Sequence, residues 1–187
     1  MFNQAEKLNR RAGQPQFKAE QIISQLAIEP GAIIADIGSG GGYFTIRFAC
    51  ATGREGKVYA VDTNKRFLAY VEELSAKNNL ENIETILVRG GLSGLPPNGC
   101  DLVFLRNVFH HLSDVEKYFK DLRVYLKPEG CVAIIDYKKG KALDFIALKR
   151  HYTEETLIGK TMINAGYKLV QRYEFLPEQS FGIYQLA

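Results

Sequence analysis

The stretch that decides the fold is Ala32–Phe44, AIIADIGSGGGYF, in which a short apolar run leads directly into a glycine-rich loop. The run is rich in Ile and has one charged residue, Asp36, which is typical of a strand buried on both faces. Four of the five positions 38–42 are glycine. Glycine accepts positive φ and lets backbone approach a ligand closely, so the loop predicts a strand-to-helix turn that lines a binding site.

Similar apolar runs recur along the chain. They are short, rich in Val and Ile, and bounded by Gly, Pro or Asn, at residues 57–62, 83–88, 101–105 and 131–137. Two further runs, 167–175 and 181–186, are joined by about five residues, too few for a parallel crossover. The chain therefore predicts an α/β fold: a Rossmann-like, doubly wound seven-stranded sheet, mostly parallel with an antiparallel C-terminal strand, in a three-layer α/β/α sandwich.

The segments between these runs have helical spacing of apolar residues. We predict a leading helix from Phe17 that ends before Pro30 and Gly31, and a second that begins at Thr63 or Asn64. A third covers residues 114–126 and stops before Pro128, and a last one, capped by Thr153, extends to Gly166.

Length and composition indicate one ordinary globular domain. The chain has 187 residues and a net charge of +3, and the single domain 1–187 divides into an N-terminal helical segment 1–30, a cofactor-binding core 31–137, a possible lid 138–152 and a final part 153–187. The first thirty residues contain no apolar signal region, and no run of about 18 apolar residues is present for stable membrane insertion. We expect a cytoplasmic protein.

The three cysteines, Cys50, Cys100 and Cys131, fit neither a disulfide framework nor a metal knuckle, so we expect small core residues, reduced thiols and no metal. The pI of 8.7 is only mildly basic, and basic residues are mixed with acids along most of the chain, which argues against nucleic acid as a partner.

The loop spacing discriminates between nucleotide ligands. A dinucleotide fingerprint needs a small residue where Tyr43 stands, and no Gly-Lys-Ser/Thr follows, which excludes a P-loop. Asp62 lies 24 residues after Gly38, a spacing that suits a hydrogen bond to a ribose diol, although capping of the next helix is the alternative role. An NAD-type Rossmann oxidoreductase remains an alternative.

The motifs ADIGSGGGYF, VYAVDTN, DLVFLRNVFHHL and LKPEGCVAIID resemble those of class I S-adenosylmethionine-dependent methyltransferases, over residues 15–187. The likeness is to small stand-alone domains of the type seen in ubiquinone and menaquinone biosynthesis methyltransferases. It implies methyl transfer from S-adenosylmethionine to a small-molecule acceptor by in-line displacement. The implied cofactor-binding residues are Asp36, Gly38, Ser39, Gly40, Gly42, Tyr43, Asp62, Thr63, Gly91, Leu92, Arg106 and Asn107.

One position departs from the family pattern. Many relatives have an acid after the third strand that binds the adenine amino group, whereas this chain has Gly91 there and no acid between Arg89 and Asn98. We therefore expect weaker adenine discrimination. The departure also leaves open a non-catalytic domain that only binds S-adenosylmethionine.

Candidates for the acceptor side lie at strand exits. Histidine can serve as a base near neutral pH, and the candidate catalytic residues are His110, His111, Tyr137 and His151. Asp136 and Arg150 are similar candidates, and solvation or local hydrogen bonding is the alternative for each. If the adjacent histidines occupy a helical turn, we expect only one of them to face the site. The basic segment 138–151 is either a solvated face or a lid that favours an anionic or amphipathic acceptor, and the few cysteines argue against arsenite as acceptor.

Overall fold

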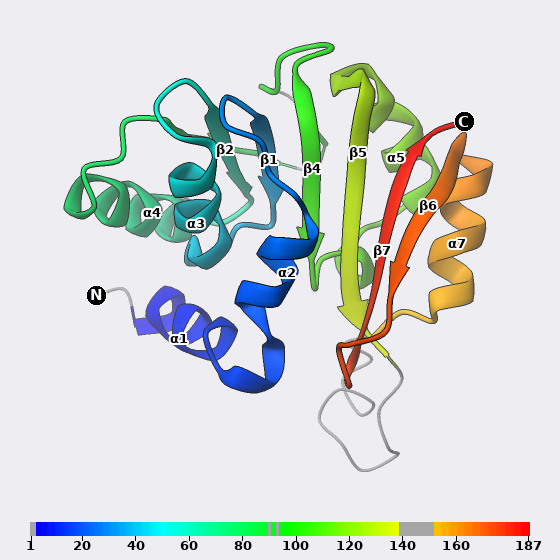
Figure 1. Cartoon of the computed structure of the whole chain (residues 1–187), viewed down its shortest axis with the longest axis horizontal. Helices are drawn as coiled ribbons and strands as arrows, with labels where there is room; N and C mark the ends of the chain where they lie inside the picture. Colours follow the sequence, from blue (N-terminus) through cyan, green and yellow to red (C-terminus); the bar gives the residue numbers. More distant parts are fainter. Residues whose placement is uncertain (1–2, 90, 93, 139–151) are drawn as a thin grey trace.

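The computed structural model describes residues 3–89, 91–92, 94–138 and 152–187. Its centre is a seven-stranded sheet in the order β3-β2-β1-β4-β5-β7-β6 (Figure 1). The strands are β1 (Ile33–Ile37), β2 (Lys57–Asp62), β3 (Ile83–Leu87), β4 (Cys100–Arg106), β5 (Leu126–Tyr137), β6 (Tyr167–Tyr173) and β7 (Gln179–Leu186). The first five are parallel to one another, whereas β7 pairs antiparallel with both β5 and β6, as predicted.

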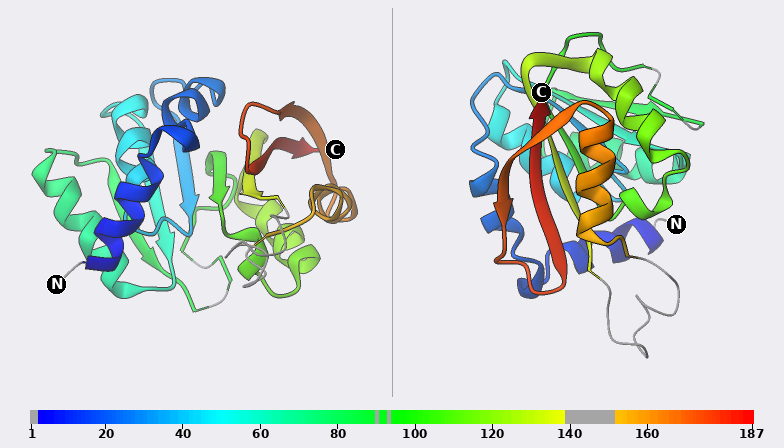
Figure 2. Two further views of the ribbon diagram at one scale, coloured as in Figure 1. Left: turned by 90° about the horizontal axis from the view of Figure 1, so that it is seen from below. Right: turned by 90° about the vertical axis from the view of Figure 1, so that its right-hand side faces the viewer.

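Helices cover both faces of this sheet, so that the three layers of the prediction are confirmed (Figure 2). The helices α2 (Ala19–Gln25), α3 (Tyr43–Thr52) and α4 (Lys65–Lys77) cover one face, and α5 (Val115–Leu122) and α7 (Glu155–Asn164) cover the other. Aromatic side chains such as Phe48 and Phe104 fill the first interface, and Phe119 and Met162 fill the second. Burial of apolar side chains between these layers is the main force that holds the fold together.

The N-terminal helical segment contains a separate helix before Phe17 that the sequence analysis did not predict. This helix, α1 (Asn3–Ala12), lies at the carboxyl end of the parallel strands and contacts α3 and α4 (Figure 1). It was missed because its residues are mainly polar and give no broad apolar stripe. A 3₁₀ turn, Pro15–Phe17, connects it to α2.

Several predicted boundaries are wrong. The helix expected over 114–126 is α5 from Val115 to Leu122, capped by Asp114 and followed by a 3₁₀ turn. The next strand begins at Leu126 and not at Cys131, because β5 continues through Pro128 and Gly130 beyond a register irregularity against β4.

Thr153 is not the cap of the last helix. Glu154 occupies that position, and the Thr153 hydroxyl instead donates a hydrogen bond to Asp136 at 3.2 Å. The helix also ends at Asn164, two residues earlier than predicted.

The cysteines are only partly as expected. Cys100 is buried, Cys131 is half-buried and Cys50 is exposed on α3, so the prediction of three core residues is wrong for Cys50. Burial raises the pKa of the Cys100 thiol to about 12 and that of Cys131 to about 11, which disfavours a thiolate at either position. Within the described ranges, every helix is too short or too polar to traverse a lipid bilayer.

Candidate functional site

A cavity of about 600 Å³ opens at the carboxyl edge of the parallel strands, where β1 and β4 are neighbours. The chain leaves these two strands toward opposite faces of the sheet, which creates a crevice between them. We call Asp36, residues 38–41, Asp62 and Thr63 the acidic side of the cavity. We call Arg11, Phe17, Arg106, His110 and Tyr137 its basic side. All of these residues line the cavity.

The glycine loop is confined between two other parts of the chain. Gly38 has φ of +69°, and a Cβ there would lie 2.3 Å from a methyl group of Val108, which follows β4. A Cβ on Gly41 would lie 2.4 Å from the carbonyl oxygen of Ala5 in α1. The Asn9 side chain donates a hydrogen bond of 2.7 Å to the Gly41 carbonyl and holds α1 against the loop. Any larger residue would displace these neighbours, so the tight turn depends on glycine.

Asp62 fixes the shape of the loop with both carboxylate oxygens. One oxygen accepts the Gly40 amide at 2.9 Å and the other accepts the Asn64 amide at 2.8 Å. Asn64, and not Asp62, is the cap of α4, because its side chain accepts the Arg66 amide. The Asp62 carboxylate therefore joins the ends of β1 and β2 at the cavity wall.

Asp36 is buried at the end of β1 and accepts a hydrogen bond of 2.6 Å from the Thr45 hydroxyl. The pKa of this carboxyl is raised to about 7, mainly by burial and to a lesser degree by the neighbouring Asp62 charge, while the Thr45 hydrogen bond opposes the shift. A cation bound beside Asp36 would favour the charged form. The buried Ser39 hydroxyl has no hydrogen-bond partner among the described residues, so it too is available to a ligand.

The basic side contains two guanidinium groups held by aromatic rings. Arg106 lies 5.1 Å from the Phe17 ring centroid and 5.3 Å from that of Phe44, while Arg11 lies 5.8 Å from the rings of Phe17 and Tyr137. Burial lowers the pKa of Arg106, and its buried Nε has no partner among the described residues. Neither guanidinium forms an ion pair within that part of the chain. This side is suited to an anionic or flat aromatic group.

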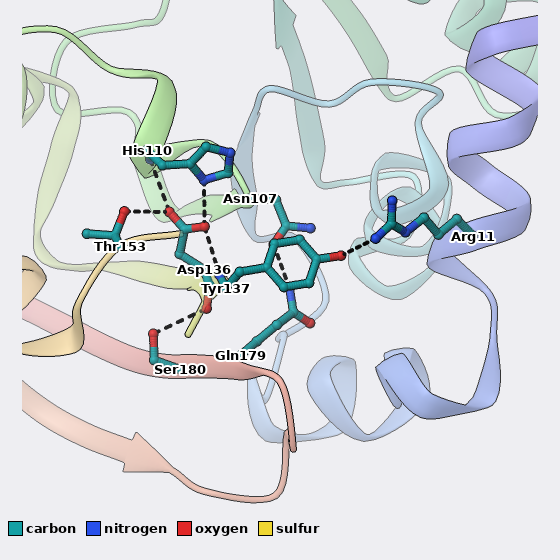
Figure 3. A network of polar contacts seen from close by, with 8 residues as sticks. All are labelled: Arg11, Asn107, His110, Asp136, Tyr137, Thr153, Gln179 and Ser180. Atoms are coloured by element: carbon teal, nitrogen blue, oxygen red, sulfur yellow. Dashed lines mark hydrogen bonds and ion pairs between the residues drawn. The ribbon is translucent and has the colours of Figure 1, made fainter. Parts of the chain in front are cut away.

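His110 and His111 lie in a 3₁₀ turn, Phe109–His111, directly after β4. Both line the cavity, so the expectation that only one faces it is wrong. The rings lie beside each other with centroids 4.1 Å apart, which places both at the same wall. The ring of His110 contacts the buried carboxylate of Asp136 at 2.8 Å (Figure 3).

Most of the residues that the sequence analysis selected meet at this cavity. Those that line it are Asp36, Gly38, Ser39, Gly40, Tyr43, Asp62, Thr63, Gly91, Arg106, Asn107, His110, His111 and Tyr137. Gly42 and Leu92 lie behind the wall, since Gly42 packs against Val71 and Leu92 is part of the core. Asp136 is fully buried beneath the basic side. Arg150, His151 and nearly all of the possible lid 138–152 lie outside the described residues.

Sequence reasoning missed the contribution of the N-terminal segment. Leu8, Asn9, Arg11 and Phe17 all line the cavity, and the Arg11 guanidinium donates a hydrogen bond of 3.0 Å to the Tyr137 hydroxyl. The segment contains no glycine loop or strand exit, so no local signal marks it. No three His, Cys, Asp or Glu side chains within the described ranges are placed to hold a metal ion.

The acidic loop after β1 and the carboxylate after β2 belong to a known pattern. Residues 28–174, most of the chain, match a protein family described as a methyltransferase domain. The chain belongs to this methyltransferase family. Its fold, its cofactor S-adenosylmethionine and its class of enzyme, a class I S-adenosylmethionine-dependent methyltransferase, agree with the resemblance found in the sequence.

Individual relatives point the same way. The methyltransferase is 31% identical over 110 residues to an arsenite methyltransferase of Halobacterium salinarum. The aligned region covers 59% of this chain and 28% of the relative. It is 26% identical over 121 residues to a ubiquinone/menaquinone biosynthesis C-methyltransferase of Francisella tularensis. Here the aligned region covers 64% of this chain and 48% of the relative. The chain therefore spans half or less of the length of these two relatives.

A solved structure matches nearly the whole chain. A SAM-dependent methyltransferase from Aquifex aeolicus superposes with a TM-score of 0.89 at 25% identity, covering 98% of this chain and 97% of the other. The match supports the described arrangement of α1, the sheet and the C-terminal strand pair as one unit.

Proposed function

We propose that this protein transfers the methyl group of S-adenosylmethionine to a small organic acceptor bound on the basic side of the cavity. The observation that carries the proposal is the convergence of the glycine loop, Asp36 and Asp62 on a cavity of about 600 Å³, within the size range of small-molecule sites.

The residues present suit this cofactor. S-adenosylmethionine has an ammonium and a sulfonium group, and a cation beside Asp36 would offset the cost of burying that carboxylate. Asp62 lies at the end of β2, where its carboxylate can meet a ribose diol across the loop. We assign Gly38, Ser39 and Gly40 to contacts with the cofactor and Gly91 to its adenine. Arg106, which interacts with Asp36 where the basic side meets the acidic side, and Asn107 are assigned to the methionine part.

The protein's contribution to the reaction is mainly alignment. When bound, the cofactor supplies an activated methyl group with a neutral leaving group. The Asp36 and Asp62 contacts would fix the direction of that methyl group, and α1, held by the Asn9 hydrogen bond to Gly41, would shield the loop from water. Holding donor and acceptor in line turns an encounter of two molecules into an internal step, which supplies a large part of the rate.

The basic side favours a flat acceptor with anionic character. Two guanidinium groups without ion pairs among the described residues, together with the rings of Phe17 and Tyr137, form its wall. Cysteine is absent from the described lining, in keeping with an organic acceptor rather than arsenite. We also propose a cytoplasmic location, supported by the unpaired thiols, and no requirement for metal or nucleic acid.

Titration calorimetry with S-adenosylhomocysteine and with NAD tests the cofactor assignment. We expect binding of S-adenosylhomocysteine and none of NAD, since Tyr43 occupies the place of the small residue in a dinucleotide site. Binding of NAD alone would overturn the proposal in favour of an oxidoreductase. Turnover of methyl-labelled S-adenosylmethionine on a panel of organic acceptors then separates an enzyme from a domain that only binds the cofactor.

A further inference from the structure

The end of β5 holds a buried carboxylate, Asp136, that forms no ion pair with a lysine or arginine in the described residues. The Asp136 side chain has no exposed surface. One of its oxygens accepts the Tyr137 amide at 2.8 Å, and the other accepts the His110 amide at 3.1 Å and the Thr153 hydroxyl at 3.2 Å (Figure 3). A buried carboxylate is costly unless hydrogen bonds compensate it, and this one is compensated from three separate segments.

The same carboxylate fixes the proton position on His110. Nδ1 of the His110 ring lies 2.8 Å from the Asp136 oxygen that also accepts the Tyr137 amide. An ionised carboxylate can only accept, so Nδ1 must donate its hydrogen. In a neutral imidazole the other nitrogen, Nε2, then carries the basic lone pair.

The basic nitrogen is turned away from the carboxylate. Figure 3 shows the second ring nitrogen of His110 on the side of the ring opposite Asp136, and His110 lines the cavity. Only 5% of the side chain is exposed, so the ring is fixed within the wall. The backbone hydrogen bond from His110 to Asp136 holds the turn as well as the ring.

We infer that His110 is the general base of the methyl transfer, that Asp136 is its positioning residue, and that the acceptor is a phenol- or enol-type hydroxyl compound whose proton must leave. The inference rests on the proposed function. In the step, the acceptor oxygen or its conjugated carbon forms a bond to the methyl carbon. The bond from that carbon to sulfur breaks with its electron pair, the acceptor proton passes to Nε2 of His110, and the imidazolium is stabilised by Asp136.

The basic side suits this acceptor class. A phenol or enol develops negative charge as its proton leaves, and Arg11 and Arg106 line the same cavity without an ion pair in the described part of the chain. Its ring can lie against Phe17 and Tyr137, whose ring centroids are 5.8 Å from the guanidinium carbon of Arg11. An acceptor without a dissociable proton would need no such base.

The proton position can be measured without turnover. Imidazole ¹⁵N NMR of the neutral ring should show His110 with hydrogen on Nδ1, and Asp136→Asn should shift the population towards hydrogen on Nε2. His111 should keep its tautomer in that variant. Hydrogen on Nε2 of His110 in the unsubstituted protein would overturn the inference.

Kinetics provide the second test, with 2-naphthol, 4-hydroxycoumarin and 1,4-dihydroxynaphthalene as acceptors. We expect His110→Gln to lower kcat on the order of 100-fold or more, with Asp136→Asn intermediate, while KM for S-adenosylmethionine changes little. His111→Gln should lower kcat far less. A larger loss at His111, unchanged kcat in His110→Gln, or no turnover of any of these compounds would overturn the inference.

Binding of S-adenosylhomocysteine distinguishes failure of the proposed function from failure of the assignment of His110 as the base. If the unsubstituted protein does not bind it, the proposed function fails. If His110→Gln and Asp136→Asn bind it normally and yet methylate the panel at the unsubstituted rate, only the assignment of the base fails. Normal binding also shows that the Asp136→Asn protein is folded.

Discussion

The acidic and basic sides of the cavity differ in how the chain assembles them. On the acidic side, Asp36 and Thr45 are nine residues apart, and Asp62 and Gly40 are 22 apart. On the basic side, Arg11 and Tyr137 are 126 residues apart, and Arg106 donates a hydrogen bond of 3.4 Å to Gln179, 73 residues away. The carboxylate contacts of the first side therefore lie within one βαβ unit, against whose loop Val108 and α1 pack, whereas the second side exists only after the whole sheet and α1 have come together.

This difference suggests separate functions for the two sides. A local unit can keep one ligand site while distant segments change, so the acidic side is suited to the invariant cofactor and the basic side to a particular acceptor. If the division is correct, substitutions on the acidic side should change cofactor affinity most strongly. Substitutions on the basic side should act mainly on the acceptor.

The largest effect is expected for Gly38→Ala. Its Cβ would lie 2.3 Å from Val108, at φ of +69°, and would push the loop out of its binding shape. We expect S-adenosylhomocysteine affinity to fall about 100-fold, or about 2.7 kcal/mol, together with a lower melting temperature. Isothermal titration and thermal melting measure the two effects.

Gly31→Ala is the matched control. Gly31 has a similar φ of +82°, but a Cβ there would meet nothing within 4 Å, and the residue is outside the cavity. Backbone strain alone costs about 1–3 kcal/mol, so the control should lose stability and retain affinity. An equal loss of affinity in both variants would mean that the loop acts through general stability and not through its shape.

Asp62→Asn should have the next largest effect. The asparagine side chain has only one accepting oxygen, so it cannot replace both hydrogen bonds from the backbone N–H groups of Gly40 and Asn64. It is also uncharged and would form weaker hydrogen bonds with a ribose diol. We expect S-adenosylhomocysteine to bind about 30-fold more weakly, about 2 kcal/mol, by titration.

Asp101→Asn is the comparison for this change. Asp101 also accepts a backbone amide, that of Ile33 at 2.8 Å, and a Lys127 ammonium at 2.7 Å, but it lies at the opposite edge of the sheet. Its substitution should reduce stability without reducing affinity. Weaker binding in Asp101→Asn than in Asp62→Asn would contradict the location of the cofactor.

The same division explains what the sequence predicted. The order of strands and helices, the glycine loop and Asp62 follow from local patterns of apolar residues and glycine, and the sheet confirms the fold they imply. The sequence did not predict that Arg11 lines the cavity, because α1 has no broad apolar stripe. It also did not predict the hydrogen bond from Thr153 to Asp136, because threonine before a helix is typical of a helix cap. The sequence analysis also predicted β5 too short, starting at Cys131. Proline usually ends an element, whereas β5 continues through Pro128.

A smaller effect is expected from pH, through Asp36. Its pKa is raised from 3.8 to about 7 in the folded chain, so between these values the folded protein binds more protons than the unfolded one, and stability falls as pH rises. A cationic ligand needs the charged carboxylate. S-adenosylhomocysteine affinity should therefore fall by up to about tenfold from pH 8 to pH 6.

Asp36→Asn should flatten this pH dependence and bind more weakly at pH 8. The asparagine oxygen can still accept the Thr45 hydroxyl hydrogen, so the fold around it is retained. Affinity that rises on acidification, or a slope that persists in Asp36→Asn, would show that another group controls binding and that Asp36 does not face the cationic part of the ligand.

The smallest effect is expected at Gly91, where many relatives have an acid. Gly91→Asp would place a carboxylate where a Cβ meets nothing within 4 Å, but at φ of +124°, which strains any residue other than glycine. A hydrogen bond to a carboxylate contributes about 1.5–3 kcal/mol and the strain costs about 1–3 kcal/mol, so the two nearly cancel in affinity. Gly91→Ala has the strain without the carboxylate. The ratio of affinities for S-adenosylhomocysteine and its deaminated analogue S-inosylhomocysteine should rise several-fold in Gly91→Asp relative to Gly91→Ala. An unchanged ratio would mean that Gly91 does not face the adenine amino group, and the acidic side would then end before the third strand.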